Sequence, residues 1–293
     1  MEFATPEEQG KRSIIESEGW RIEYAVWTSE NLPKKDVPVV VAFHGFARPL
    51  EDLHSAHLAW PFPHVMVSIH LPHHGGSTPI PGSGEDDRII EPGVFNRILD
   101  LIIRREVQNA KDRTLLGYSI GGRIGLALAA DRPKSWQHAV FLAPDGLKQS
   151  PFYAITVHTQ LGRWAWFWMD RNEKRVWKWS DALLKWGLIS KHLHGFVYFH
   201  SSSHAMRMMV WRGWRTHRGC WPSHRAIAAA LERIPRTSFV FGEYDKIIPT
   251  RNASRLRRMT QRSPHISFQT VRSGHNMLKT ETMETVVRCI FGS

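Results

Sequence analysis

A single serine between glycines is the strongest candidate for a nucleophile in this chain. The pentapeptide Gly117-Tyr118-Ser119-Ile120-Gly121 follows an apolar run and precedes a segment rich in alanine and leucine. A very tight strand-to-helix turn strains the backbone of its central residue and leaves no room for flanking side chains, which explains the glycines. This G-x-S-x-G pattern is typical of a nucleophile elbow, which lifts a serine hydroxyl above a sheet beside a helix N-terminus. A helix-capping serine on a glycine-rich turn gives the same local pattern.

A serine hydroxyl is a poor nucleophile at neutral pH until a base takes its proton, so further groups must supply the chemistry. Asp245 in GEYDKIIP and His275 in SGHNM complete the order Ser…Asp…His. In this arrangement His275 is the general base and then the general acid. Asp245 holds the imidazole in the required tautomer and stabilises its cation.

Other interpretations of these residues remain open at this point. Asp245 could be an ordinary turn aspartate before Pro249, and His275 could be a structural histidine. Asp145, in LAPDG at the end of the preceding strand-like segment, is an alternative acid; it could also be a turn aspartate or a hinge to the segment that follows.

Each candidate follows a segment that the sequence predicts to be a strand. Several of these segments are near-continuous runs of Val, Ile and Phe, as expected for strands buried on both faces of a parallel sheet. Helical patterns lie between them, and strand–helix alternation predicts a doubly wound α/β sheet with its site at the carboxyl ends of the strands. The predicted strands are 19–28, 37–44, 64–70, 113–118, 137–143, 236–242 and 265–272, and the predicted helices are 91–107, 121–131, 223–233, 251–261 and 280–291.

With motifs at these strand ends, the chain resembles the α/β-hydrolase superfamily, and within it the serine hydrolases with a cap domain, such as carboxylesterases and lipases. The motifs are HGF (44–46), PHHGGS (72–77), GYSIGG (117–122), GEYDKIIP (242–249) and SGHNM (273–277). The resemblance covers residues 19–146 and 232–293. It implies the α/β-hydrolase fold, a mostly parallel doubly wound sheet with a helical cap inserted after the sixth strand. We therefore expect a core of residues 1–146 and 232–293, and a cap of residues 147–231.

The same resemblance bears on the reaction. The elbow supplies the backbone N–H of Ile120 to an oxyanion hole, and the resemblance adds that of Phe46, which follows the turn residues His44 and Gly45. Relatives that open epoxides or displace halides carry aspartate where this chain has Ser119, so the serine favours acyl transfer. This chemistry requires neither a metal nor an organic cofactor.

A histidine-rich segment also suggests a metal site. His70, His73 and His74, with His44, lack the spacing of a helical H-E-x-x-H site, and no carboxylate is interleaved among residues 70–74, so metal binding is disfavoured. Relatives often carry D-x-R-G-H-G-x-S in the corresponding loop, and this chain departs from that pattern.

The predicted cap differs in composition from the rest of the chain. The net charge is +12, and residues 151–230 hold 12 Lys or Arg against 3 Asp or Glu, together with 9 of the 13 tryptophans. We expect most of these aromatic side chains to line a substrate tunnel, which implies a hydrophobic acyl group. Tryptophan beside Lys and Arg also suits an anionic membrane surface, and a basic cap could bind an acidic acyl carrier. No recognition motif supports nucleic-acid binding.

The sequence therefore predicts a serine hydrolase that cleaves a carboxylic ester, or a thioester, with a hydrophobic acyl part through an acyl-enzyme. An acyltransferase or C–C hydrolase with the same machinery is the near alternative. A non-catalytic ligand-binding or membrane-binding protein is the alternative from another class. Two cysteines, no basic-then-apolar leader and no membrane-length apolar run predict a cytoplasmic protein, with peripheral membrane association left open.

Overall fold

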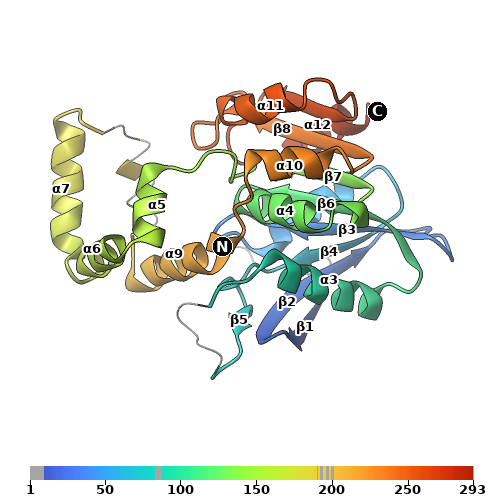
Figure 1. Ribbon diagram of the computed structural model, residues 1–293, viewed down its shortest axis with the longest axis horizontal. Coiled ribbons are helices and arrows are strands. Elements are labelled where there is room, and N and C mark those ends of the chain that lie inside the picture. The colour runs from blue at the N-terminus through green and yellow to red at the C-terminus, as the bar shows by residue number, and fades with distance from the viewer. Residues whose placement is uncertain are drawn as a thin grey trace. The chain divides into compact units, whose positions relative to one another are not determined.

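The computed structural model describes residues 10–82, 88–189, 191, 194, 195, 198 and 201–292, and the described strands form one nine-stranded sheet (Figure 1). Their order is β1-β2-β4-β3-β6-β7-β8-β9, and the two-residue β5 pairs with β2. The strands are β1 Lys11–Ser17, β2 Trp20–Thr28, β3 Val37–Phe43, β4 Val65–Ile69, β5 Thr78–Pro79, β6 Ala110–Tyr118, β7 His138–Leu142, β8 Arg236–Gly242 and β9 Ile266–Val271.

The sheet is parallel from β4 through β3, β6, β7 and β8 to β9, and only the pairings of β2 are antiparallel. Every residue of β4 and β7 is buried, because helices cover both faces of a parallel sheet. The predicted mostly parallel, doubly wound sheet is therefore confirmed. Strand β1 was not predicted. It is an edge strand with an alternating, half-exposed burial pattern, and its sequence KRSIIES is mostly polar.

The helices around the sheet form two packed groups. Helix α4 packs against α3 and α10, and α2 packs against α12. Pro92 begins α3, a position where its missing N–H costs no helical hydrogen bond. The helices are α2 His54–Ala59, α3 Pro92–Glu106, α4 Ile120–Asp131, α10 His224–Leu231, α11 Ser254–Met259 and α12 Thr280–Phe291, with 3-10 turns at Leu50–Leu53, Pro133–Ser135 and Thr250–Ala253.

The chain divides into two compact units, of which the sheet with these helices is the first. The second consists mainly of Gln149–Arg218, and it enters the chain after β7, the sixth strand when β5 is not counted. We expected the insertion to extend to residue 231, but residues 219–231 belong to the first unit. Cys220, Ile227 and Leu231 are buried in the core of the sheet unit, and α10 packs on α4.

The second unit is helical, with α5 Pro151–His158, α6 Gln160–Arg171, α7 Glu173–Lys185 and α9 His204–Thr216. Its interior is aromatic, since the buried rings of Trp166 and Trp211 stack with their centroids 5.8 Å apart. Gly162 permits the close approach of α5 and α6, because a Cβ there would lie 2.1 Å from the carbonyl oxygen of Ile155. No helix among the described residues is both long and apolar enough to cross a lipid bilayer.

Candidate active site

Ser119 lies at the junction of β6 and α4, in a backbone conformation that few residues other than glycine adopt. Its φ is 55° and its ψ is −119°. The turn is held on both sides, because the Ser119 N–H donates to the carbonyl of Leu142 at 3.0 Å and the Ser119 carbonyl accepts from Gly122 at 2.9 Å. Strain of this kind persists only where the surrounding structure fixes it, and it is common at functional sites.

The flanking glycines are sterically required. A Cβ on Gly117 would lie 2.7 Å from the carbonyl oxygen of Gly121, and a Cβ on Gly121 would lie 2.4 Å from that of Phe43. Both atoms belong to the backbone, so neither contact could be relieved by a side-chain rotation. The glycines therefore let α4 begin directly against β3 and β6, as the sequence pattern indicated.

The structure brings Ser119, His275 and Asp245 into one hydrogen-bonded line. His275 Nε2 lies 3.1 Å from Ser119 Oγ, and His275 Nδ1 lies 2.7 Å from Asp245 Oδ2. The three residues follow β6, β9 and β8, so three separate strand ends supply them. Donation of the Nδ1 proton to the carboxylate leaves Nε2 as the acceptor that faces the serine hydroxyl.

Asp245 is fixed by its own turn. Its side chain is fully buried, and Oδ1 accepts hydrogen bonds from the amides of Ile247 and Ile248 at 2.8 and 2.9 Å. Burial alone would raise the pKa of Asp245, but the hydrogen bond and positive charge of His275, together with the two amides, lower the pKa below its usual value. The group is therefore held as a carboxylate that can stabilise an imidazolium.

Tyr118 contacts His275 through both its hydroxyl and its ring, and this contact was not predicted from the sequence. Its hydroxyl donates to the carbonyl of His275 at 3.0 Å, and the two ring centroids lie 5.3 Å apart. Burial raises the pKa of Tyr118 above its usual value, so the hydroxyl remains a donor. Gly45 makes room for this ring, because a Cβ there would lie 2.8 Å from it.

Two backbone amides lie at the ends of the neighbouring strands β3 and β6. Phe46 is in the turn after β3, where the N–H of Arg48 donates to the carbonyl of Gly45 at 3.2 Å. Ile120 is the first residue of α4, and the first amides of a helix have no partner within it. Because Phe43 pairs with Gly117 in the sheet, the turn that holds Phe46 and the helix start at Ile120 emerge side by side.

His44 ties the turn after β3 to the loop after β4. Its buried ring donates from Nδ1 to the carbonyl of Gly45 at 2.6 Å and accepts at Nε2 from the amide of Leu71 at 3.1 Å. The loop itself is held by Glu23 of β2, whose Oε2 lies 2.8 Å from His70 Nδ1 and accepts from the Gly76 amide. Glu23 was missed, since nothing in its local sequence marks it.

The histidine cluster is a packed set of rings. The His44 centroid lies 5.2 Å from that of His70 and 5.1 Å from that of His74, both edge to face. His73 packs instead against Trp20. Burial lowers the pKa of His74 to about 4, so its ring is neutral. Within the described ranges, no three His, Cys, Asp or Glu side chains are placed to bind one metal ion.

Asp145, the alternative acid, is engaged elsewhere. Its Oδ1 accepts from the Gly146 amide at 2.7 Å, and its Oδ2 lies 3.6 Å from the buried guanidinium of Arg123. Its own amide donates to the carbonyl of Ser119 at 2.9 Å. The contact of Asp145 with the elbow is therefore made by its backbone amide and not by its side chain, whereas the carboxylate at the Nδ1 atom of His275 is Asp245.

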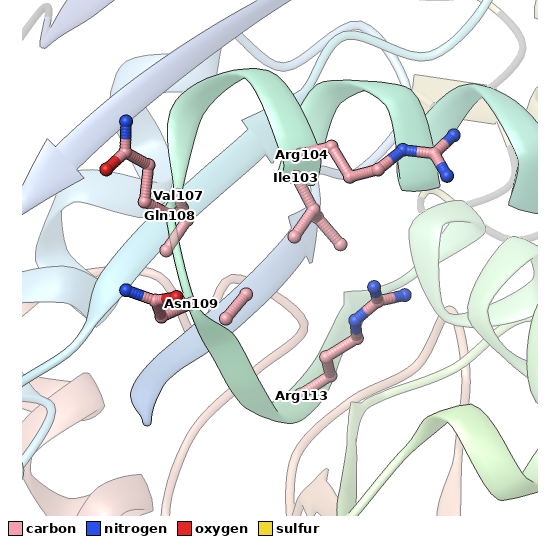
Figure 2. Close-up of a pocket in the computed structure, with 7 residues that line it drawn as sticks. Ile103, Arg104, Val107, Gln108, Asn109 and Arg113 are labelled. Carbon is pink, nitrogen blue, oxygen red and sulfur yellow. The ribbon is translucent and has the colours of Figure 1, made fainter. Parts of the chain in front are cut away.

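A surface cavity of about 420 Å³ lies at the other end of β6 (Figure 2). It is bounded by the end of α3 and by the first residues of β6, so the length of the strand separates it from Ser119. It is not part of the candidate site. Its lining residues are Ile103, Arg104, Val107, Gln108, Asn109, Ala110 and Arg113.

Comparison with known proteins places this architecture in a family. Residues 39–288 match the alpha/beta hydrolase family, and the chain belongs to that family. The resemblance inferred from the sequence motifs is thus confirmed. Comparison with curated protein sequences gives no significant match.

Solved structures with similar folds include several hydrolases. A serine hydrolase from Cycloclasticus zankles, a bacterium that degrades polyaromatic hydrocarbons, superposes with a TM-score of 0.60 at 13% identity over 96% of this chain and 98% of its own. A thermophilic esterase from Thermogutta terrifontis gives a TM-score of 0.57 at 16% identity over 97% and 96%. The thioesterase domain from the curacin biosynthetic pathway gives 0.57 at 13% identity over 96% and 98%. At these identities the likeness shows the fold.

Proposed function

We propose that the protein is a serine esterase that hydrolyses carboxylic esters with a hydrophobic acyl group. The observation that carries the proposal is the line from Ser119 Oγ through the ring of His275 to Asp245, with separations of 3.1 and 2.7 Å. A serine hydroxyl, an imidazole and a buried carboxylate in this order are the groups that nucleophilic acyl transfer needs.

In the first half of the reaction, Ser119 Oγ attacks the ester carbonyl carbon while its proton passes to His275 Nε2. Asp245 stabilises the imidazolium through Nδ1–H. The oxyanion accepts hydrogen bonds from the amides of Ile120 and Phe46. The tetrahedral intermediate then collapses, the alcohol takes the proton from Nε2 and leaves, and Ser119 carries the acyl group.

In the second half, His275 Nε2 takes a proton from water as the water oxygen attacks the acyl carbon. The second tetrahedral intermediate collapses, the proton returns to Ser119 Oγ, and the carboxylic acid leaves. Each amide donor to the oxyanion is worth on the order of a hundredfold in rate or more.

Two other features bear on the acyl group and the reaction class. The abundance of aromatic side chains in Gln149–Arg218 supports a hydrophobic acyl part. The similar fold of the esterase and of the thioesterase domain supports an ester or a thioester as the substrate. Acyl transfer to an alcohol is the second candidate because it proceeds through the same acyl-enzyme.

The test is hydrolysis of p-nitrophenyl esters from acetate to palmitate by the native protein and by Ser119→Ala. We expect turnover by the native protein and a loss of at least a thousandfold in the variant, with Asp145→Asn as a matched control that retains activity. Turnover that survives Ser119→Ala would refute the proposal. Absence of turnover on every ester and thioester would favour a non-catalytic binding protein, and more ester product than acid in the presence of an added alcohol would favour a transferase.

A further inference from the structure

Glu23 of β2 lies opposite the residue with which the loop after β4 begins. Tyr24 pairs with Ile69 in the antiparallel ladder, and one step further the His70 N–H donates to the Glu23 carbonyl at 3.0 Å. Side chains that lie opposite each other in such a ladder project to the same face. The two side chains accordingly meet, with His70 Nδ1 2.8 Å from Glu23 Oε2. The first residue of the loop is therefore joined to β2 by its backbone and by its ring.

Both carboxylate oxygens of Glu23 accept hydrogen bonds. Oε1 accepts from Arg12 Nη1 of β1 at 2.9 Å, and Oε2 accepts from the Gly76 amide at 2.6 Å as well as from His70. Burial alone would raise the pKa of Glu23, but the hydrogen bonds from Gly76, His70 and Arg12 lower the pKa below its usual value. Burial lowers the pKa of His70, so its ring is neutral and Nδ1–H is the donor. Only a carboxylate accepts on both sides in this way.

The loop packs closely around this carboxylate. A Cβ on Gly75 would lie 2.6 Å from Glu23 Oε2 and closer still to the ring of His70, so the loop backbone passes directly over the pair. The amide of Glu23 donates to Ser77 Oγ at 2.9 Å, and the Ser77 hydroxyl donates to the His70 carbonyl at 2.8 Å. Since both ends of the loop contact Glu23, a shift of this residue moves the loop.

The loop reaches the candidate active site through His44. The amide of Leu71, which follows His70, donates to His44 Nε2 at 3.1 Å, and His44 Nδ1 lies 2.6 Å from the Gly45 carbonyl oxygen. An amide only donates and a carbonyl only accepts, so His44 is a neutral imidazole with its proton on Nδ1. The position of the loop therefore sets the orientation of the His44 ring.

The carbonyl that His44 holds belongs to the same peptide unit as the N–H of Phe46. A peptide unit is planar, so the direction of its carbonyl fixes the direction of its N–H. The Gly45 oxygen accepts from the Arg48 amide as well, at 3.2 Å, and the two donors together fix the plane. A donor that stabilises a developing oxyanion must be oriented before the reaction, because reorganisation during the reaction costs rate.

We propose that Glu23 is a positioning residue for the reaction: through the loop after β4 and His44, it holds the peptide unit of Gly45 and Phe46 so that the Phe46 N–H points at the oxyanion. The inference rests on the proposed function, in which this amide is one of two oxyanion donors. Relatives often begin the loop with aspartate, and this chain has His70 there, so the carboxylate that holds the loop comes from a distant strand.

The test is the variant Glu23→Gln, which keeps the size of the side chain. Its amide has one accepting oxygen, so either Arg12 or Gly76 is left facing an NH₂ group. We expect kcat on p-nitrophenyl esters to fall about tenfold to a hundredfold while KM changes less than about threefold. An alkyl trifluoromethyl ketone, whose carbonyl carbon takes up Ser119 Oγ to form a hemiketal oxyanion, should bind more weakly by the same factor as kcat falls.

Glu106→Gln is the matched control. Glu106, at the end of α3, accepts from the Tyr24 hydroxyl at 2.7 Å and from Lys11 Nζ at 2.9 Å, so it is a carboxylate joined to β1 and β2 as Glu23 is. Its printed partners lie outside the loop after β4. We expect this variant to lower the melting temperature about as much as Glu23→Gln and to leave kcat and ketone binding as in the native protein.

Amide hydrogen exchange, followed by mass spectrometry, tests the path from Glu23 without turnover. In Glu23→Gln, the peptides that cover residues 44–48 and 70–77 should exchange at least severalfold faster, whereas Glu106→Gln should leave them unchanged. Circular dichroism of each variant establishes that the fold is retained.

Three outcomes would overturn the inference. One is unchanged exchange at residues 44–48, another is unchanged kcat in Glu23→Gln, and the third is an equal fall of kcat in Glu106→Gln, which would make the effect one of stability. A native protein that hydrolyses no ester and forms no adduct at Ser119 refutes the proposed function instead. In that case exchange at residues 44–48 decides whether Glu23 holds the peptide unit of Phe46.

Discussion

The hydroxyl of Tyr118 donates to the carbonyl oxygen of His275 at 3.0 Å, so the residue next to Ser119 holds the loop that carries His275. The two residues are 157 positions apart in the chain, and the ring contact between them adds to the hydrogen bond. The distance from His275 Nε2 to Ser119 Oγ is thereby fixed through a residue whose position on β6 is itself fixed by the sheet.

Replacement of Tyr118 by Phe tests this relationship. The variant keeps the ring and loses the hydrogen bond, which is worth about 1 kcal/mol. We expect a loss of about that size in the free energy of unfolding and a severalfold fall in kcat with little change in KM, measured by urea denaturation and ester kinetics. A fall in stability with unchanged kcat would mean that the contact is structural only.

Asp245→Asn should reduce kcat on the order of a thousandfold or more while the protein stays folded. The amide can still accept from Ile247 and Ile248, but it no longer stabilises the imidazolium and it disfavours the tautomer that keeps Nε2 free. Asp145→Asn is the control, since its carboxylate contacts Arg123. Equal losses in the two variants would contradict the assignment of Asp245.

Gly121→Ala should destabilise or prevent folding, because its Cβ would lie 2.4 Å from the carbonyl oxygen of Phe43. Overpacking of this kind typically costs 1–3 kcal/mol, and a contact with backbone on both sides costs about that or more. Gly93→Ala, in the first turn of α3, meets nothing closer than 3.7 Å and should stabilise the protein by up to about 1 kcal/mol. Thermal melting of both variants measures the difference.

The free energy of unfolding should fall as the pH drops from 7 to 5. Burial lowers the pKa of His74 and of His138 to about 4, whereas in an unfolded chain a histidine takes up its proton near pH 6.5. The stability from each neutral ring is thus fully present above about pH 6.5. It is lost on acidification by up to about 1.4 kcal/mol per pH unit, until the folded protein is protonated as well.

Urea denaturation at several pH values measures this slope. His138→Asn removes one of the titrating rings and should flatten the curve between pH 7 and 5 by up to about 1.4 kcal/mol per unit. A free energy of unfolding that does not change over this interval would contradict a neutral state for the buried histidines. The carboxylates affect the curve mainly below this window.

The sheet and the three residues of the candidate site could be predicted from the sequence because short stretches of neighbouring residues indicate them. Long apolar runs predicted the buried strands, and the elbow glycines follow from a turn whose backbone excludes any side chain. The position of Asp245 and His275 after strands placed them at one edge of the sheet, since carboxyl ends of parallel strands meet there. The hydrogen-bonded line is consistent with that placement.

The remaining features depend on contacts between distant parts of the chain. Glu23 has no local pattern that marks it, and it matters because β2 lies beside the loop with His70 and Gly76. Strand β1 is polar because it is an edge, so its composition resembles that of a loop. The end of the insertion was misplaced because the composition of residues 219–231 does not show that Cys220 and Leu231 belong to the core.

Gln149–Arg218 belong to one compact unit, whereas Ser119, Asp245 and His275 all lie in the other. Ser119, Asp245 and His275 follow β6, β8 and β9, and the glycines on either side of Ser119 leave no room for a Cβ. The inserted helices carry none of these three residues, so a substitution on their surface removes no atom of the hydrogen bonds among them. The composition of the insertion can therefore vary independently of the contacts that hold Ser119, His275 and Asp245 together.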